Sequence, residues 1–93
     1  MKFDWHLEKA QSNLKKHGIS FEEGSSVFDD FLAYIFDDKY SSINENRELI
    51  IGYSNLNNLL VVSFTEREDG LIRIISCREA TTRERKNHEQ HRS

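Results

Sequence analysis

The sequence predicts an α+β domain, with two N-terminal helices packed on an antiparallel sheet of about four strands and a basic helix at the C-terminus. Apolar residues recur at helical spacing before residue 31, whereas runs typical of strands follow one another between residues 31 and 78. Helices and strands are thus segregated along the chain, which is the α+β pattern. The 93 residues form a single domain, 1–93, with a thin core.

The N-terminal part predicts a short strand and two helices. Residues 2–5 alternate polar and apolar side chains, as a short strand does. A helix then begins at Leu7 and ends at Gly18, which suits the left-handed position after a helix. Its inner face is expected to hold Leu7, Ala10 and Leu14. Ser20 and Glu23 have capping-box spacing and start a second helix of about two turns.

Four strands are predicted in the middle of the chain, at residues 31–36, 48–53, 59–67 and 71–78, with a polar loop at 37–46. Asp69-Gly70 predicts a hairpin between the last two strands. If Arg67 pairs with Leu71, Phe64 faces Ile74 and Leu60 faces Arg78. This register places Phe64 and Ile74 on the face that packs against the helices, and Cys77 on the opposite face.

The C-terminal helix is predicted to start at Thr81 or Thr82. Thr81 and Glu84 again have capping-box spacing. The helix carries basic residues and no strong apolar stripe, so we expect it to pack weakly unless a partner orders it.

Charge is distributed unevenly along the chain. The net charge is −3, yet residues 78–93 carry five Lys or Arg against three Asp or Glu, and residues 1–19 carry four against two. Basic ends flank an acidic middle, which leaves nucleic acid open as a ligand. There is one cysteine, no apolar run near the ~18 residues of a membrane span, and no apolar signal segment, so we expect a cytoplasmic protein.

Few chemical motifs are present. The histidines and the single cysteine lack metal-ligand spacing, and there is no Gly-rich phosphate loop or nucleophile elbow. Cations close to acid–base groups remain, which suits RNA cleavage without a metal or another cofactor. That reaction needs a base for the 2′-hydroxyl, cations for the phosphate charge and an acid for the leaving oxygen.

Several segments of the chain resemble the BrnT toxins, in order and over almost its whole length. They are Lys2–Trp5, Lys9 with Asn13–Glu23, Val27–Asp30, Ile50–Ser54, Phe64–Arg67, and Ile72–Arg78 with Ala80-Thr81 and Arg83–Arg85. The resemblance implies a RelE-like fold and a toxin of a type II toxin–antitoxin system that cleaves mRNA and arrests translation. It also implies a hetero-oligomer with a BrnA-like antitoxin, whose ribbon-helix-helix domain would bind operator DNA.

We predict a site at the junction between the last strand and the last helix. There Arg78 and Arg83 would hold the phosphate, while His88, His17 or Glu66 would transfer protons. Glu66 and Arg67 rank second, because the predicted register puts them at the other end of the hairpin. Further RNA contacts are predicted from Lys15, Lys16, Arg73, Arg85 and Lys86.

A purely structural role remains open for each of these residues. Arg83 and Arg85 can be solvated, Arg78 can form a surface ion pair with Glu79 or Glu84, and the cations before Gly18 complement the helix dipole. Asn57-Asn58 replaces a Gly-Arg pair frequent in the resembling family, and His88 stands where tyrosine is common. These departures support an alternative function as a non-catalytic binding module or co-repressor.

Overall fold

The computed structural model describes residues 1–38 and 46–92. Its elements in chain order are β1 (Lys2–Asp4), α1 (Leu7–His17), α2 (Phe21–Ser26), the 3-10 turn η1 (Val27–Asp29), β2 (Tyr34–Asp37), β3 (Arg47–Tyr53), β4 (Leu59–Glu66), the 3-10 turn η2 (Glu68–Gly70), β5 (Leu71–Glu79) and α3 (Thr82–Arg92). Most of the predicted polar loop at 37–46 lies outside the described residues. No described helix is long and apolar enough to cross a membrane.

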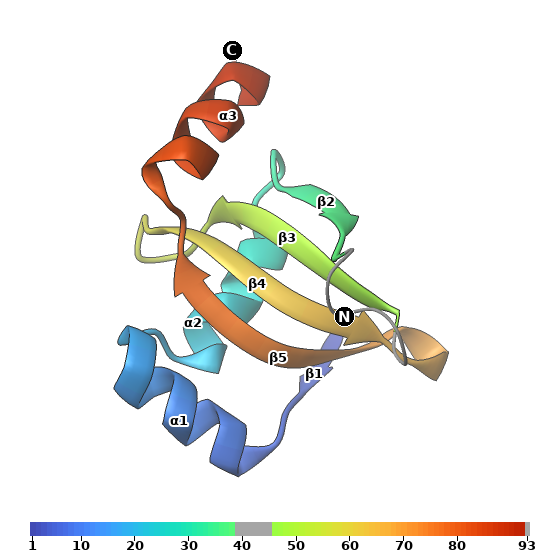
Figure 1. Cartoon of the computed structure of the whole chain (residues 1–93). Helices are drawn as coiled ribbons and strands as arrows, with labels where there is room; N and C mark the ends of the chain where they lie inside the picture. The colour runs from blue at the N-terminus through green and yellow to red at the C-terminus, as the bar shows by residue number, and fades with distance from the viewer. Residues whose placement is uncertain (39–45, 93) are drawn as a thin grey trace.

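The described strands form one mixed sheet in the order β1-β5-β4-β3-β2 (Figure 1). The prediction of about four antiparallel strands was wrong in detail, because β1 joins the sheet as a fifth strand parallel to β5. The short strand at residues 2–5 was itself predicted, but its place in the sheet was not, because only three residue pairs, from Lys2–Leu71 to Asp4–Arg73, join it to a strand far along the chain. The α+β class is confirmed, and a RelE-like relationship stays a prediction.

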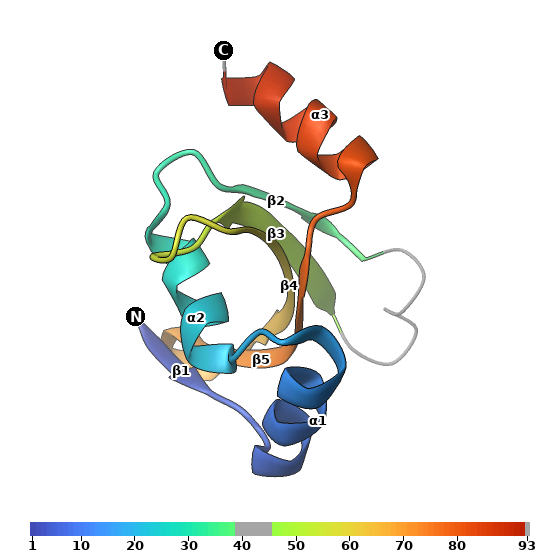
Figure 2. The same ribbon diagram turned by 90° about the vertical axis from the view of Figure 1, so that its left-hand side faces the viewer.

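The helices lie on both sides of the sheet, with α2 packed on one face and α3 against the other. In Figure 2, α2 lies within the curve of the sheet, α1 lies below β5, and α3 projects away from the end of β5. The main core lies between the sheet and α2, and includes Phe21, Val27, Leu60, Val62, Phe64, Ile74 and Cys77. A smaller cluster of Ile51, Leu59 and Val61 lies on the opposite face. That opposite face is called the open face below.

A β-bulge corrects the predicted hairpin register. Phe64 pairs with Ile74 as predicted, but Ser63 pairs with Ser76, so Ile75 is an extra residue on β5. Beyond the bulge every pair shifts by one, and Leu60 faces Glu79 instead of Arg78. The shift turns Cys77 into the main core, where its side chain is fully buried.

The inner face of α1 also differs from the prediction. Leu7 and Leu14 are 68% and 51% exposed, whereas Asn13 is buried. Asn13 donates from Nδ2 to the carbonyl oxygen of Cys77 at 2.8 Å and accepts at Oδ1 from the Cys77 N–H at 3.0 Å. The helix therefore packs on the polar edge of β5, and an amide side chain satisfies backbone groups that apolar residues would leave unpaired.

Both predicted capping sites are present. Ser20 Oγ accepts from the N–H of Glu23 at 3.0 Å, and Thr81 Oγ1 accepts from the N–H of Glu84 at 3.1 Å. Glu84 Oε1 also accepts from the Thr81 N–H at 2.8 Å, so the second box is reciprocal. The first box is not, because Glu23 Oε2 accepts from Ser54 Oγ at 2.6 Å instead. That bond ties α2 to the turn after β3.

Candidate functional site

At the predicted junction, Arg78 is engaged by a carboxylate of α3. Its Nη1 and Nη2 donate to Oε1 and Oε2 of Glu84 at 2.7 and 2.9 Å. These bonds, with the N–H of Thr81, lower the pKa of Glu84 to about 2. The Glu84 carboxylate thus occupies the two guanidinium nitrogens of Arg78 that could otherwise bind two oxygens of a phosphate.

The other junction residues have unlike surroundings. Arg83, Arg85 and Lys86 are exposed on α3. His88 is 3% exposed, and its ring centroid lies 6.0 Å from that of Tyr53 on the open face. Arg83 and His88 are about 140° apart around the helix axis, since an α-helix has 3.6 residues per turn. His88 therefore anchors α3 to the sheet, while Arg83 lies on a different side of the helix.

A basic cleft lies where α1 meets the open face. It has a volume of about 480 Å³ and is lined by Glu8, Lys9, Ser12, Asn13, Lys16, His17, Arg47, Ile75 and Ser76. Three cations and a histidine face a single carboxylate there. Lys9, Lys16 and His17 have no ion-pair partner within the described part of the chain, which leaves them available to an anionic ligand.

A smaller hollow of about 50 Å³ continues this cleft. It is lined by His6, Lys9, Thr65, Arg67, Arg73, Ile74 and Ile75, and so shares Lys9 and Ile75 with the cleft. Arg47, Thr65 and Arg73 pair directly across β3, β4 and β5, which places their side chains on one face of the sheet. The basic surface therefore runs from the end of α1 across the open face.

One acidic residue balances part of this surface. Asp4 accepts from Nε and Nη2 of Arg73 at 3.0 and 2.9 Å. The hydrogen bond from Arg73 holds the pKa of Asp4 below its usual value, and the nearby charges of Arg67 and His6 act in the same direction. Asp4 thus pairs with Arg73, while His6, Lys9 and Arg67 also line the hollow.

Asn13 positions the helix that supplies most of the cleft. Its Nδ2 also donates to the carbonyl oxygen of Ile19 at 3.0 Å, so three hydrogen bonds hold this one side chain. Lys9 lies one turn before it, and Lys16 and His17 lie one turn after it. Residues at that spacing share one side of a helix, so the anchor at Asn13 presents all three to the cleft.

Sequence reasoning placed some of these residues and missed others. His17, Lys16, Arg67 and Arg73 were predicted, and they lie along the cleft and the hollow. Lys15 is exposed on α1 outside the cleft lining, and Glu66 is exposed at the end of β4. The missed residues are His6, Lys9, Asn13 and Arg47. Helical spacing from Lys9 to Lys16 was the available signal for α1.

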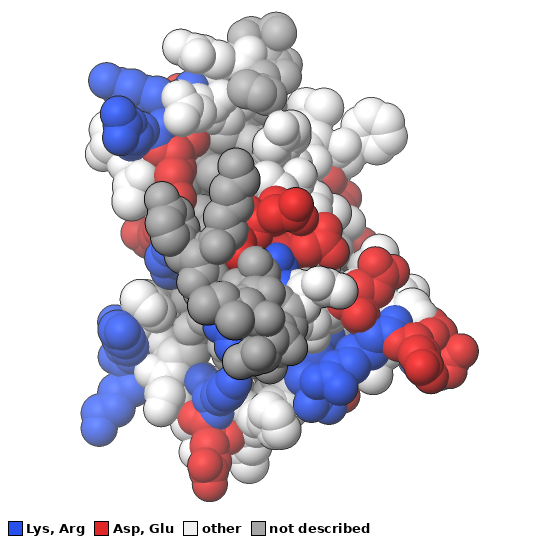
Figure 3. All heavy atoms as spheres, turned by 45° about the vertical axis from the view of Figure 1, so that its right-hand side comes forward, with Lys and Arg blue, Asp and Glu red and all other residues white. Residues whose placement is uncertain are grey.

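The charges seen in space-filling form agree with this distribution. Figure 3 shows Lys and Arg gathered over the lower half of one view, interrupted by Asp and Glu, and a second group at the upper left. Among the described residues, no three His, Cys, Asp or Glu side chains form a group that could hold a metal ion.

The fold and the cleft define a class: a small α+β domain that presents a basic cleft beside one face of its sheet. Residues 5–84 match the family described as ribonuclease toxin, BrnT, of type II toxin–antitoxin system. The chain belongs to this BrnT family. It is also similar to the crystal structure of the Brucella abortus ribonuclease toxin BrnT, with 27% identity and a TM-score of 0.70. That match covers 88% of this chain and 99% of the other, whereas no curated protein matches the sequence.

Proposed function

We propose that the chain is an endoribonuclease that cleaves mRNA and so arrests translation, and that the basic cleft binds the RNA backbone. The observation that carries this proposal is the gathering of Lys9, Lys16, His17 and Arg47 between α1 and the open face. Cations clustered in one cleft fit a polyanion, and membership of a ribonuclease toxin family names RNA as that polyanion.

The cleft also contains the groups that the reaction needs. Lys16 and Arg47 neutralise the charge that develops on the phosphate during attack by the 2′-hydroxyl. His17 takes the proton of the 2′-hydroxyl, since histidine commonly acts as a general base and this one is exposed at the rim of the cleft, and the leaving 5′-oxygen takes its proton from water. These steps need no metal ion. Arg67 extends the contact to the next phosphate along the strand, and Arg73 does so only if Asp4 releases it.

In this proposal the residues of the predicted junction bind RNA outside the reacting centre. Arg83, Arg85 and Lys86 are exposed cations on α3, suited to phosphates further along the RNA. Arg78 binds RNA only if Glu84 releases it, and Glu66 lies beyond the cleft lining. His88 serves packing, because it is nearly fully buried.

The family sets the cellular context of the proposal. A type II system pairs its toxin with a protein antitoxin. We propose a BrnA-like antitoxin with a ribbon-helix-helix domain, a hetero-oligomer of the two proteins in the cytoplasm, and repression of their own operon through operator DNA bound by the antitoxin.

One observation favours the non-catalytic alternative. Both Arg73 and Arg78 are held in two-point contacts by carboxylates of this same chain, Asp4 and Glu84. Arginines engaged in this way are poor phosphate ligands until the pair opens. A binding module or co-repressor would bind its antitoxin without cleaving RNA.

Incubation of the purified chain with end-labelled mRNA in EDTA, with and without ribosomes, tests the nuclease directly. We expect cleavage with 2′,3′-cyclic phosphate ends, because the 2′-hydroxyl is the proposed nucleophile. Folded protein that cleaves in neither condition contradicts the proposal. Growth arrest on expression in bacteria separates the nuclease from the binding module, which causes none.

Lys15 and Lys16 form a matched pair that tests the place of the site. Both are exposed lysines on the last turn of α1, but only Lys16 lines the cleft. Lys16→Ala is expected to weaken RNA binding and cleavage by roughly 10-fold, and Lys15→Ala by less than about 2-fold. Equal effects would show that the charge of the helix end matters and the cleft does not.

A further inference from the structure

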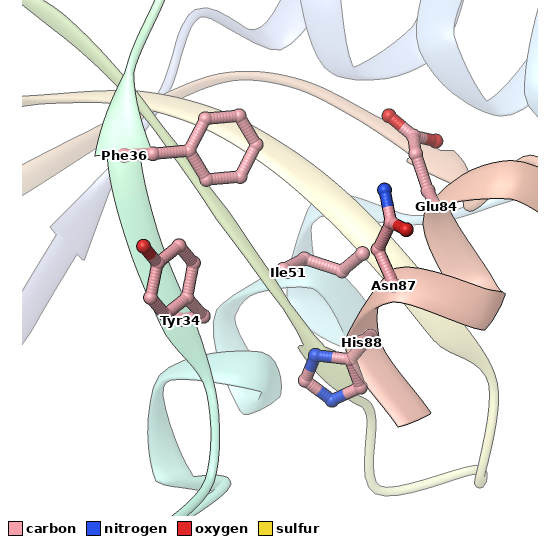
Figure 4. A pocket seen from close by; sticks show the side chains of 6 residues that line it. All are labelled: Tyr34, Phe36, Ile51, Glu84, Asn87 and His88. Carbon is pink, nitrogen blue, oxygen red and sulfur yellow. The ribbon is translucent and has the colours of Figure 1, made fainter. Parts of the chain in front are cut away.

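An apolar groove separates α3 from the sheet and takes no part in the reaction proposed above. It has a volume of about 290 Å³ and is lined by Tyr34, Phe36, Ile51, Glu84, Asn87 and His88. Figure 4 shows Tyr34 and Phe36 of β2 on one side and the three α3 side chains on the other, with Ile51 between them. The groove thus has an aromatic wall and a wall that carries polar groups.

The aromatic wall presents flat surfaces to any occupant. The ring centroids of Tyr34 and Phe36 are 6.1 Å apart with an interplanar angle of 33°. Tyr34 is half exposed although it is aromatic, so part of its ring is available for contact. Single-stranded RNA is bound in this way, by stacking of unpaired bases on aromatic side chains.

The opposite wall carries groups that recognise the edges of bases. Asn87 carries an amide with both donor and acceptor atoms, whereas the oxygens of Glu84 already accept from Arg78 and Thr81. Arg83 is one turn before Asn87 and about 40° from it around the helix axis, so this exposed cation lies beyond the Asn87 side of the groove and outside its lining. A stacking surface, hydrogen-bonding groups and an exposed cation are what a nucleotide requires.

The size of the groove argues against a protein ligand. Its volume of about 290 Å³ is just below the roughly 300–1,000 Å³ typical of small-molecule sites. One planar ring system fits such a space, whereas a helix of about 10 Å diameter does not. Its amide and carboxylate are also unsuited to a purely aliphatic side chain.

From these observations we infer that the groove binds one unpaired nucleobase of the RNA substrate and gives the nuclease its sequence preference. This inference rests on the proposed function, because it names a substrate contact of the same protein. The base stacks on Tyr34 and Phe36, Asn87 contacts its edge, and Arg83 contacts the adjoining phosphate. The cleft beside α1 holds the reacting phosphate.

Titration with adenosine, guanosine, cytidine and uridine tests the groove alone, because nucleosides carry no phosphate for the basic cleft. The probe is the amide spectrum of the ¹⁵N-labelled chain. We expect saturable shifts at Phe36, Asn87 and His88, with unequal affinities for the four nucleosides. Shifts elsewhere, or none up to the solubility limit, overturn the inference.

Variants of Tyr34 test the same contact with RNA. Tyr34→Ala is expected to weaken binding of single-stranded RNA by roughly 5- to 100-fold and to flatten the sequence preference of cleavage. Tyr34→Phe keeps the stacking ring and is expected to behave as the unsubstituted chain. Phe31→Ala is the control, since Phe31 is an exposed aromatic outside the groove.

The outcomes separate this inference from the nuclease itself. If RNA is cleaved but Tyr34→Ala changes neither affinity nor preference, the groove is not a base site and the nuclease stands. If nucleosides bind the groove but RNA is not cleaved, the base site stands and the nuclease falls. Loss of antitoxin binding by Tyr34→Ala, with nucleosides failing to shift the groove, assigns the groove to a protein and overturns the inference.

Discussion

Removal of the Asn13 side chain is the sharpest structural perturbation of the cleft. Asn13→Ala deletes hydrogen bonds of 2.8, 3.0 and 3.0 Å to the carbonyl of Cys77, the N–H of Cys77 and the carbonyl of Ile19. Two carbonyls and one N–H on a buried edge of the fold lose their partner together.

The expected cost follows from these three bonds. Each contributes about 1 kcal/mol, and alanine returns roughly 0.6 kcal/mol in helix propensity, so the net loss is about 2–3 kcal/mol. For a chain of this length that corresponds to a drop in Tm of roughly 10–20 °C. Urea and thermal unfolding, followed by circular dichroism, measure it.

Two further variants make the reasoning refutable. Asn13→Asp keeps the acceptor for the Cys77 N–H but loses both donated bonds, and it sets a charge against two carbonyls, so it should cost at least as much. Gln11→Ala, at an exposed position of the same helix, should stay within about 0.5 kcal/mol of the unsubstituted chain. If Asn13→Ala also stays within that range, Asn13 does not hold α1 on the sheet.

Three other predictions concern the Arg78–Glu84 ion pair at the start of α3 and the main core. The fold lowers the pKa of Glu84 from its ordinary 4.5 to about 2. The ionised carboxylate therefore adds about 1 kcal/mol to the free energy of unfolding at this exposure. That contribution is present above pH 4.5 and is lost as the pH falls toward 2. Unfolding of Glu84→Gln should lack that acid-dependent loss. Gly24→Ala places a methyl group against Cys77 Sγ and should lower the free energy of unfolding by about 1–3 kcal/mol. In the Cys77→Ala background the same change should lower it by much less, and equal losses in the two backgrounds refute the clash. Burial raises the pKa of Cys77 to about 12, so iodoacetamide should modify this thiol at neutral pH only after unfolding, and rapid labelling of the folded chain contradicts that.

Local signals in the sequence predicted the local structure well. Gly18 ends α1 with a left-handed φ of 72°, and Thr81 with Glu84 begins α3, because these features depend on a few adjacent residues. The hairpin at Asp69-Gly70 was likewise predicted, as far as Phe64 and Ile74.

Features that depend on distant residues were not predicted. The bulge at Ile75 leaves no mark in the alternation pattern, yet it decides which face Cys77 and Arg78 occupy. The apolar periodicity predicted Leu7 and Leu14 on the buried side of α1, but the buried residue is the polar Asn13. The cleft unites Lys9 with Arg47, which are 38 positions apart and meet only because α1 packs on the edge of β5.

The candidate site changed accordingly. The junction of Arg78, Arg83 and His88 was inferred from their nearness in sequence, which says nothing about direction around a helix. His17 was named as a proton-transfer group without a known environment, and the structure places it at the rim of the basic cleft. Its role there stays a proposal.

The rate of RNA cleavage by His17→Ala, measured beside His88→Gln, tests the central claim most directly. If His17 transfers protons in the cleft, His17→Ala lowers kcat by roughly 10²- to 10⁴-fold with little change in RNA affinity, since that is the usual contribution of a general acid or base. His88→Gln then keeps most of the activity of the folded chain. The opposite pattern, with His17→Ala fully active and folded His88→Gln inactive, would return the reacting centre to α3 and contradict the account.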